Sequence, residues 1–322
     1  MSERSAQRAA SERGERGGAH FQRVAIVGAG LLGGSLGLAL RERELAREVV
    51  AVVRRAGAQR EVVALGIADR AERELAAGVR GADLVVLASP VHAMAGLVAE
   101  LAPQLSPGAI VTDVGSVKGV LAESIPALLP AGVTYVGSHP MAGGHQTGYA
   151  HARADLFEDA ACIVTPARPA NPAAEERVLW LWRALGARAL RRSAARHDEE
   201  VAWVSHAPHA IAFAFAASLA DAPAGARELA GPGFRDFTRI AASDPAMWAD
   251  ILVSNKQALA GPLLSAAERA AALARAIESG DRDAVATLLT AARDQLAAGG
   301  TNAPSGGAIP EISAAKSAAP KE

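Results

Sequence analysis

A glycine-rich turn near the start of the chain constrains the fold more than any other feature. The sequence GAGLLG at 28–33 follows the apolar run RVAIV and precedes an apolar stretch that reaches Leu40. Between a strand and a helix, such a turn is typical of dinucleotide-binding folds, because it lets a pyrophosphate approach the backbone at the helix N-terminus. The alternative is a glycine-rich turn in a fold that binds no nucleotide. The predicted cofactor-binding residues here are Gly28, Gly30, Leu31, Leu32 and Gly33, with Ser89 after the later run ADLVVLA.

The residues after the second apolar run bear on which dinucleotide the chain binds. Folds specific for NAD usually place an acidic residue at the end of this strand, where it holds the ribose 2′-hydroxyl. Here the position is Val53, and Arg54 and Arg55 follow it. Two guanidinium groups in place of a carboxylate suit a 2′-phosphate. We therefore predict binding of NAD(P), with NADP favoured over NAD. The alternative is that both arginines are solvated surface residues.

The pattern of apolar residues changes once along the chain. In the first half, short β-branched runs alternate with Ala- and Leu-rich stretches, and several runs are apolar without alternation. This is typical of parallel strands covered on both faces, hence of a Rossmann-like, doubly wound α/β domain. After about Arg196, helical periodicity takes over. We predict an α/β domain at 21–195 and an all-α domain at 196–297, with disordered segments at 1–20 and 298–322.

Composition excludes several classes of protein. The 322 residues carry a net charge of −1, which argues against nucleic-acid binding as a main role. Cys162 is the single cysteine, so an intrachain disulfide framework is excluded. The sequence has no run of about 18 uncharged apolar residues, and its polar start lacks the apolar core of a secretory signal. We expect a soluble cytoplasmic protein without a membrane segment.

The helical half predicts a homodimer. Its helices carry apolar residues around much of their circumference, as at Ile211, Phe213, Phe215 and Leu219. A helix that is apolar on all sides must be buried. A small helical domain offers little room for such burial, so we expect its helices to pack against a second copy of the chain.

Three further segments carry polar side chains at places where a binding site is expected. TDVGSVK at 112–118 and GSHPMAGG at 137–144 each follow an apolar run in the first half. Binding crevices of open α/β sheets lie beyond the carboxyl ends of the strands, so these two segments should line one crevice. GPGFRDFTRIAASDP at 231–245 lies in the helical half and could close the site from that side.

Together these segments resemble the prephenate/arogenate (cyclohexadienyl) dehydrogenase family. The resemblance runs from about Phe21 to about Leu296, and it rests on the order and spacing of the motifs rather than on any single one. The matching stretches are DVGSVK at 113–118, SHPMAG at 138–143, HDEEVAWVSHAPH at 197–209, GFRDFTRIAASDP at 233–245 and WADILVSN at 248–255. The resemblance implies an NAD(P)-dependent oxidoreductase of tyrosine biosynthesis, with a nucleotide-binding domain and a helical dimerisation domain.

The resemblance also implies roles for individual residues. His139 would accept the proton of the substrate's ring hydroxyl while a hydride leaves the same carbon, and Ser116 would bind that hydroxyl or orient His139. Arg239 would bind a substrate carboxylate, which its planar fork matches. The alternatives are a turn histidine at 139, a helix cap at 116 and an intradomain salt bridge at 239. Arg235 competes with Arg239 and ranks second only by the family pattern.

His206 and His209 lie three residues apart on one predicted helix face, and we predict that they contact substrate. The alternative is that they pack around Pro208. Their spacing also suits metal ligands, but no cysteine or carboxylate cluster completes a set. We therefore predict no metal site.

The chain departs from the family at one position and leaves two other functions open. His145 stands where many members have a glutamate, which puts a carboxylate role there in doubt. The short segments outside the two domains predict a monofunctional enzyme. A β-hydroxyacid dehydrogenase, with Lys256 as its catalytic lysine, would leave the HPMAG and FTR motifs unexplained. A non-enzymatic nucleotide sensor or scaffold is the other alternative, and the intact His139, Ser116 and Arg239 argue against it.

Overall fold

The computed structural model describes residues 20–144, 146–166 and 169–298, and it divides into two compact units at Leu263 and Leu264. His145 lies outside the described residues. So do the segments predicted to be disordered, apart from His20 and Ala298. None of the described helices is long and apolar enough to span a membrane.

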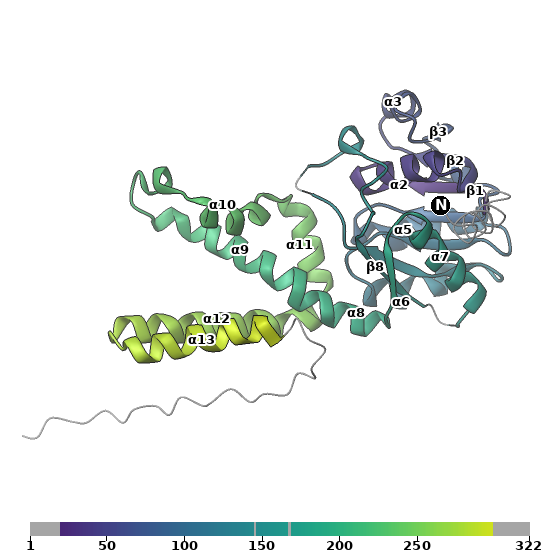
Figure 1. Cartoon of the computed structure of the whole chain (residues 1–322). Helices are drawn as coiled ribbons and strands as arrows, with labels where there is room; N and C mark the ends of the chain where they lie inside the picture. Colours follow the sequence, from purple (N-terminus) through teal and green to yellow (C-terminus); the bar gives the residue numbers. More distant parts are fainter. Residues whose placement is uncertain (1–19, 145, 167–168, 299–322) are drawn as a thin grey trace, which may run out of the picture. The chain divides into compact units, whose positions relative to one another are not determined.

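A six-stranded parallel sheet forms the centre of the first unit (Figure 1). The strands are β1 (Phe21–Val27), β2 (Ala46–Val52), β3 (Arg70–Glu72), β4 (Leu84–Leu87), β5 (Ile110–Asp113) and β6 (Thr134–Tyr135). Across the sheet the strands lie in the order β3-β2-β1-β4-β5-β6, so the chain order switches from descending to ascending between β1 and β4. This confirms the predicted doubly wound fold, and it places the binding crevice at the carboxyl ends of β1 and β4.

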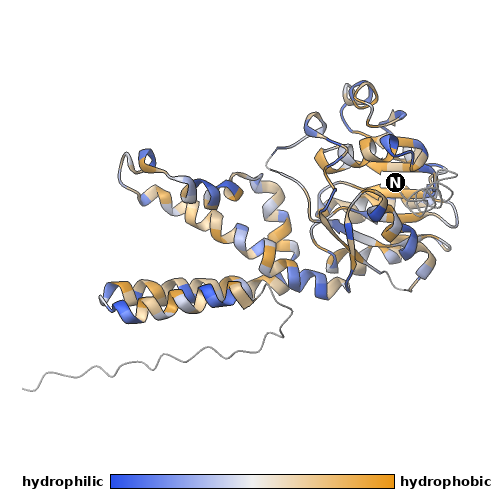
Figure 2. Cartoon of the chain, viewed as in Figure 1, coloured by the Kyte–Doolittle hydropathy of each residue, from blue (hydrophilic) through white to orange (hydrophobic). Residues whose placement is uncertain are grey.

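Helices cover both faces of this sheet. They are α2 (Leu31–Glu42), α3 (Ala58–Ala64), α4 (Leu75–Val79), α5 (Val91–Leu101), α6 (Gly119–Ser124) and α7 (Pro172–Ala184). Successive residues of β1 enter different cores: Val24 and Ile26 pack with α2 and α7, whereas Ala25 and Val27 pack with α4 and α5. Both faces are therefore buried, which is why the strands are apolar without alternation. Figure 2 shows the hydrophobic residues concentrated in these strands.

The apolar run at 133–138 is divided between two sheets. β6 ends at Tyr135, and β7 (Gly137–Pro140) begins a separate sheet with β8 (Ala161–Thr165) and β9 (Arg188–Arg191). β7 is antiparallel to β8, and β8 is parallel to β9. The chain thus leaves the main sheet just before the HPMAG segment.

Helices follow β9. They are α8 (Ala194–Val201), a π-helical turn η4 (Ala202–His206), α9 (Ala207–Ser218), α10 (Pro232–Arg239), α11 (Pro245–Ser254) and α12 (Lys256–Glu278). Short 3-10 turns lie at η1 (Ala102–Gln104), η2 (Pro126–Leu128), η3 (Tyr149–His151), η5 (Leu219–Asp221), η6 (Ala226–Leu229) and η7 (Ile240–Ala242). The π turn has a local cause, because Pro208 has no N–H to donate and its ring crowds the carbonyl four residues earlier. The second unit begins within α12 and contains α13 (Arg282–Ala298).

Candidate active site

The glycine-rich turn has the shape that a dinucleotide requires. Gly28 has φ +101°, and a Cβ atom there would lie 2.6 Å from the carbonyl oxygen of Ala88. A Cβ atom on Gly33 would lie 2.0 Å from the carbonyl oxygen of Gly28, so helix and strand pack as closely as the motif predicts. A Cβ atom on Gly30, by contrast, would meet nothing within 4 Å. The turn is therefore packed on its inner side and open where a pyrophosphate would approach the backbone.

Two further features of this crevice fit the same group. α2 begins with Leu31 and Leu32, and its cap residue Gly30 offers no side-chain acceptor, so the first N–H groups of the helix remain for an anion. Ser89 follows β4, beside the turn. Its buried hydroxyl has no hydrogen-bond partner among the described residues. An unpaired buried hydroxyl is costly, and a bound dinucleotide would supply its partner.

The arginines after β2 differ in what they contact. Arg54 is exposed, while Arg55 donates two hydrogen bonds to Glu61, at 3.0 Å and 2.7 Å. Arg55 and Glu61 both also hydrogen-bond the hydroxyl of Tyr149, which lies beyond the HPMAG segment. Val53 is buried. The Arg55 guanidinium, which the sequence predicted as a partner for a 2′-phosphate, is thus already paired with a carboxylate.

A fully buried ion pair anchors the strand that carries His139. Lys118 and Asp113 have no exposed side-chain surface and form a salt bridge, and the Lys118 ammonium also donates to the carbonyl oxygen of Ser138 at 2.9 Å. Asp113 accepts further hydrogen bonds from the hydroxyl of Tyr135 (2.9 Å) and from the backbone N–H of Ser138 (3.2 Å). These contacts join β5, β6 and β7 at Ser138, the residue before His139.

His139 lies at the end of a chain of buried polar groups. Its Nδ1 is 2.8 Å from Nε2 of His197, and Nδ1 of His197 is 2.8 Å from Oδ1 of Asp198. Asp198 also accepts from the backbone N–H groups of Lys118 and Gly119, both at 2.8 Å, at the start of α6. Burial, aided by nearby His197 and Lys118, holds the pKa of His139 well below its usual range. His139 is therefore a neutral imidazole at physiological pH.

His206 faces the same region from the π turn. The Nδ2 group of Asn255 donates to the carbonyl oxygen of Asp198 (3.0 Å), and it lies 2.9 Å from Nδ1 of His206. Because an amide nitrogen can only donate, Nδ1 of His206 is the acceptor and Nε2 carries the hydrogen. That Nε2–H is buried and has no partner among the described residues. Burial lowers the pKa of His206 to about 4.

His209 lies one turn further along and is held differently. Its ring stacks on Trp248, with centroids 3.7 Å apart, and its Nδ1 donates to the carbonyl oxygen of Ser205 at 2.8 Å. Arg239 is exposed at the end of α10. It is close enough that its charge, together with burial, lowers the pKa of His209. Arg235 instead donates to the carbonyl oxygen of Ala230, at 2.7 Å.

Ser116 lies in the loop between β5 and α6 and is partly buried. It is not a helix cap, because α6 begins at Gly119 with Lys118 at the cap position. Its side chain makes no hydrogen bond within the described part of the chain, to His139 or to any other group.

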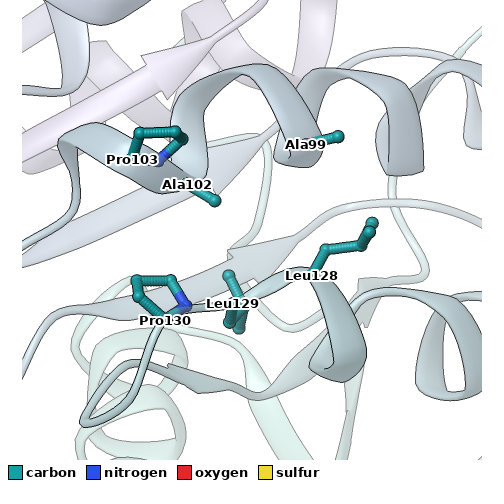
Figure 3. Close-up of a pocket in the computed structure, with 6 residues that line it drawn as sticks. All are labelled: Ala99, Ala102, Pro103, Leu128, Leu129 and Pro130. Carbon is teal, nitrogen blue, oxygen red and sulfur yellow. The ribbon is translucent and has the colours of Figure 1, made fainter.

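The structure adds polar groups that sequence reasoning did not assign to the site: His197, Asp198, Asn255, Glu61 and Tyr149. The HDEEVAWVSHAPH stretch contained the signal for the first two, since His197 and Asp198 are adjacent in it. Long-range contacts alone show that they meet His139. A separate shallow apolar hollow between η1 and η2 contains none of the predicted site residues (Figure 3).

Comparison with known proteins decides the family. Residues 36–191 match the nucleotide-binding domain of prephenate dehydrogenase, and residues 193–291 match its dimerization domain. The chain belongs to the prephenate dehydrogenase family. This confirms the resemblance seen in the sequence motifs.

The relatives of this chain within the prephenate dehydrogenase family carry different enzyme names. The chain is 34% identical to prephenate dehydrogenase of Bacillus subtilis over 72% of its own length, but it covers 64% of that protein. It is 33% identical to cyclohexadienyl dehydrogenase of Zymomonas mobilis, covering 74% of this chain and 83% of the relative.

Solved structures agree with the family assignment. Prephenate dehydrogenase of Aquifex aeolicus, in complex with hydroxyphenyl propionate and NAD+, has a TM-score of 0.79 and 30% identity, covering 86% of this chain and 97% of that one. Arogenate dehydrogenase of Synechocystis has a TM-score of 0.72 and 28% identity, covering 86% and 99%.

Proposed function

We propose that the chain is an NAD(P)-dependent dehydrogenase that oxidatively decarboxylates prephenate or arogenate, giving 4-hydroxyphenylpyruvate or tyrosine. The observation that carries this proposal is the neutral, buried His139, held by His197 within the crevice region of a dinucleotide-binding domain. Hydride removal from a carbinol carbon requires a group that takes up the hydroxyl proton, and a neutral imidazole does so at physiological pH.

In this reaction His139 accepts the proton of the ring hydroxyl. Ser116, whose hydroxyl is unpaired within the described residues, can donate to or accept from the same oxygen. The dinucleotide, when bound against Gly28, Gly30 and Ser89, supplies the hydride acceptor. The fit of the turn to a pyrophosphate supports this placement.

The helical elements supply groups for the anionic substrate. The unpaired Nε2–H of His206 can donate to a substrate oxygen, and doing so would remove the cost of leaving it buried without a partner. His209 keeps Nε2 free because its Nδ1 donates to Ser205. Arg239 beside it is the cation for a carboxylate.

We propose that the protein prefers NADP over NAD. Arg54 is free of ion pairs within the described residues, and it supports the preference. Arg55 supports it only if a 2′-phosphate replaces Glu61 as its partner, because the two side chains are paired in the structure.

The functional unit is proposed to be a homodimer formed through the helical elements. Large apolar side chains are exposed there: Trp203 at 59%, Val204 at 71% and Val253 at 69%. Adjacent exposed apolar residues, here Trp203 and Val204, mark interaction surfaces. Sedimentation at micromolar concentration should give a dimer, and a stable monomer would contradict the proposal.

One assay tests the reaction. The purified protein is mixed with prephenate or arogenate and with NAD or NADP, in all four pairs, and the reduced nicotinamide is followed by its absorbance. We expect turnover with at least one substrate, and the ratio of the two substrates shows whether the side chain is keto or amino. No turnover in any of the four pairs would refute the proposal.

A β-hydroxyacid dehydrogenase is the alternative enzyme. The chain shares its fold with a 3-hydroxyisobutyrate dehydrogenase of Salmonella typhimurium at 16% identity and a TM-score of 0.54. Lys256, the residue that would be catalytic in that case, is exposed at the start of α12, whereas its neighbour Asn255 is buried against His206. This arrangement favours the dehydrogenase of prephenate or arogenate.

A further inference from the structure

His139 can act as a base only if its free nitrogen carries no hydrogen, and the buried groups behind it determine which nitrogen that is. We propose that His197 and Asp198 are positioning residues that keep the hydrogen of His139 on Nδ1 and leave Nε2 as the proton acceptor. The proposal rests on the proposed function for its kinetic consequences, and on hydrogen-bond geometry and burial for the tautomer.

The argument starts at Asp198, because a carboxylate can only accept hydrogen bonds. Its Oδ1 accepts from the backbone N–H of Lys118 and its Oδ2 from that of Gly119. These donors, together with His197, hold the pKa of Asp198 below its usual range despite burial, so it is ionised. Since Oδ1 also lies 2.8 Å from Nδ1 of His197, that nitrogen must carry the hydrogen.

The next link follows from the charge of His197. Burial lowers its pKa, so the ring is neutral at physiological pH and its hydrogen sits on Nδ1. Its Nε2 therefore holds a lone pair. That nitrogen is 2.8 Å from Nδ1 of His139, which must donate. A neutral His139 that donates from Nδ1 has its lone pair on Nε2, where it can accept the substrate proton.

The same chain explains why one extra proton would stop the reaction. If His197 took up a proton, both its nitrogens would donate, and His139 would have to accept at Nδ1 and carry its hydrogen on Nε2. The charged and titratable groups around the two rings are Asp198 on α8, Lys118 before α6, Asp113 on β5, Cys162 on β8 and His206 on η4. Burial disfavours the extra proton at both rings, and Lys118 opposes it at both as well.

Two substitutions at one position separate positioning from packing. His197→Gln keeps a side-chain oxygen that can accept from Nδ1 of His139, whereas His197→Leu removes the acceptor at similar volume. We expect His197→Leu to lower kcat roughly 10- to 100-fold, because it removes a hydrogen bond to a group that becomes charged. His197→Gln should recover most of this loss, and substrate and cofactor KM should change less than threefold in both variants.

A matched control lies on the same helix. Glu200 pairs with Arg192 and Arg196 on the surface of α8 and does not touch His139, so Glu200→Gln should leave kcat and its pH profile unchanged. In His197→Gln the acidic limb of the kcat profile should move to lower pH, because the ring whose extra proton would reverse the hydrogen bond to His139 is gone. A purely structural role would leave that limb in place.

The tautomer itself is read without any substrate. Histidine-selective 15N labelling of the full chain reports which ring nitrogen is protonated, and the His139 signals are assigned by their loss in His139→Gln. We expect Nδ1–H with a bare Nε2 in the wild type at neutral pH, and loss of this preference in His197→Leu. An Nε2–H tautomer in the wild type would overturn the inference, as would unchanged kcat in His197→Leu. If instead the wild type turns over neither substrate while the tautomer is as expected, the proposed function has failed and the inference about His139 stands.

Discussion

Replacing Lys118 by methionine should destabilise the protein far more than the loss of any surface ion pair. Lys118 and Asp113 are both fully buried, and their salt bridge lies between β5 and the strand that carries His139. The substitution Lys118→Met keeps an unbranched side chain, one atom shorter, but removes its charge. Asp113 then retains the hydrogen bonds from Tyr135 and Ser138, but it has no cation beside it.

The magnitude follows from the burial of both partners. Leaving one charge of a buried pair without its partner costs about 3–5 kcal/mol. A folded domain is stable by about 5–15 kcal/mol in total, so this is a third or more of a typical value.

Equilibrium urea unfolding, followed by the intrinsic fluorescence of the four tryptophans, measures this cost. The double variant Asp113→Asn/Lys118→Met removes both charges, and it should be more stable than the sum of the two single effects predicts. Arg183→Gln, which breaks an exposed pair with Glu176, serves as the control and should cost less than about 1 kcal/mol. If Lys118→Met costs no more than this control, the reasoning about the buried pair is wrong.

Three other predictions concern the site. In steady-state kinetics, His139→Asn should lower kcat by about 10²–10⁴ with little change in substrate KM. Arg239→Gln should instead raise KM more than it lowers kcat. If kcat of His139→Asn stays within threefold of wild type, His139 is not the base. Glu61→Gln frees Arg55, so the ratio of kcat/KM for NADP to that for NAD should rise by up to about fivefold, and an unchanged ratio would separate Arg55 from cofactor choice. The pKa of His206 is lowered from 6.5 to about 4 in the folded state, so the unfolded chain binds its proton first and thermal stability should fall as the pH drops from 6.5 towards 4; His206→Gln should flatten this dependence, and a curve that stays as steep would exclude His206 as a cause.

The amino-acid sequence alone determined the fold class and the family of this protein, because both depend on local patterns. The apolar runs without alternation predicted a parallel sheet covered on both faces, which the structure contains. The GAGLLG turn predicted where a dinucleotide would approach the chain, and its backbone is open at Gly30. His139 could be proposed as the base because the HPMAG motif and the other motifs together identified the family.

The tertiary structure decided what those residues touch. The sequence suggested Arg55 as a phosphate ligand. In the structure, Arg55 pairs with Glu61, six residues further along in α3, and the motif does not predict this contact. His139 and His197 are 58 residues apart in the chain. Their rings come within hydrogen-bond distance only because the fold places α8 beside β7. Local patterns predict elements because they depend on near neighbours, whereas hydrogen-bond partners, burial and pKa values depend on packing between distant segments, which the tertiary fold alone creates.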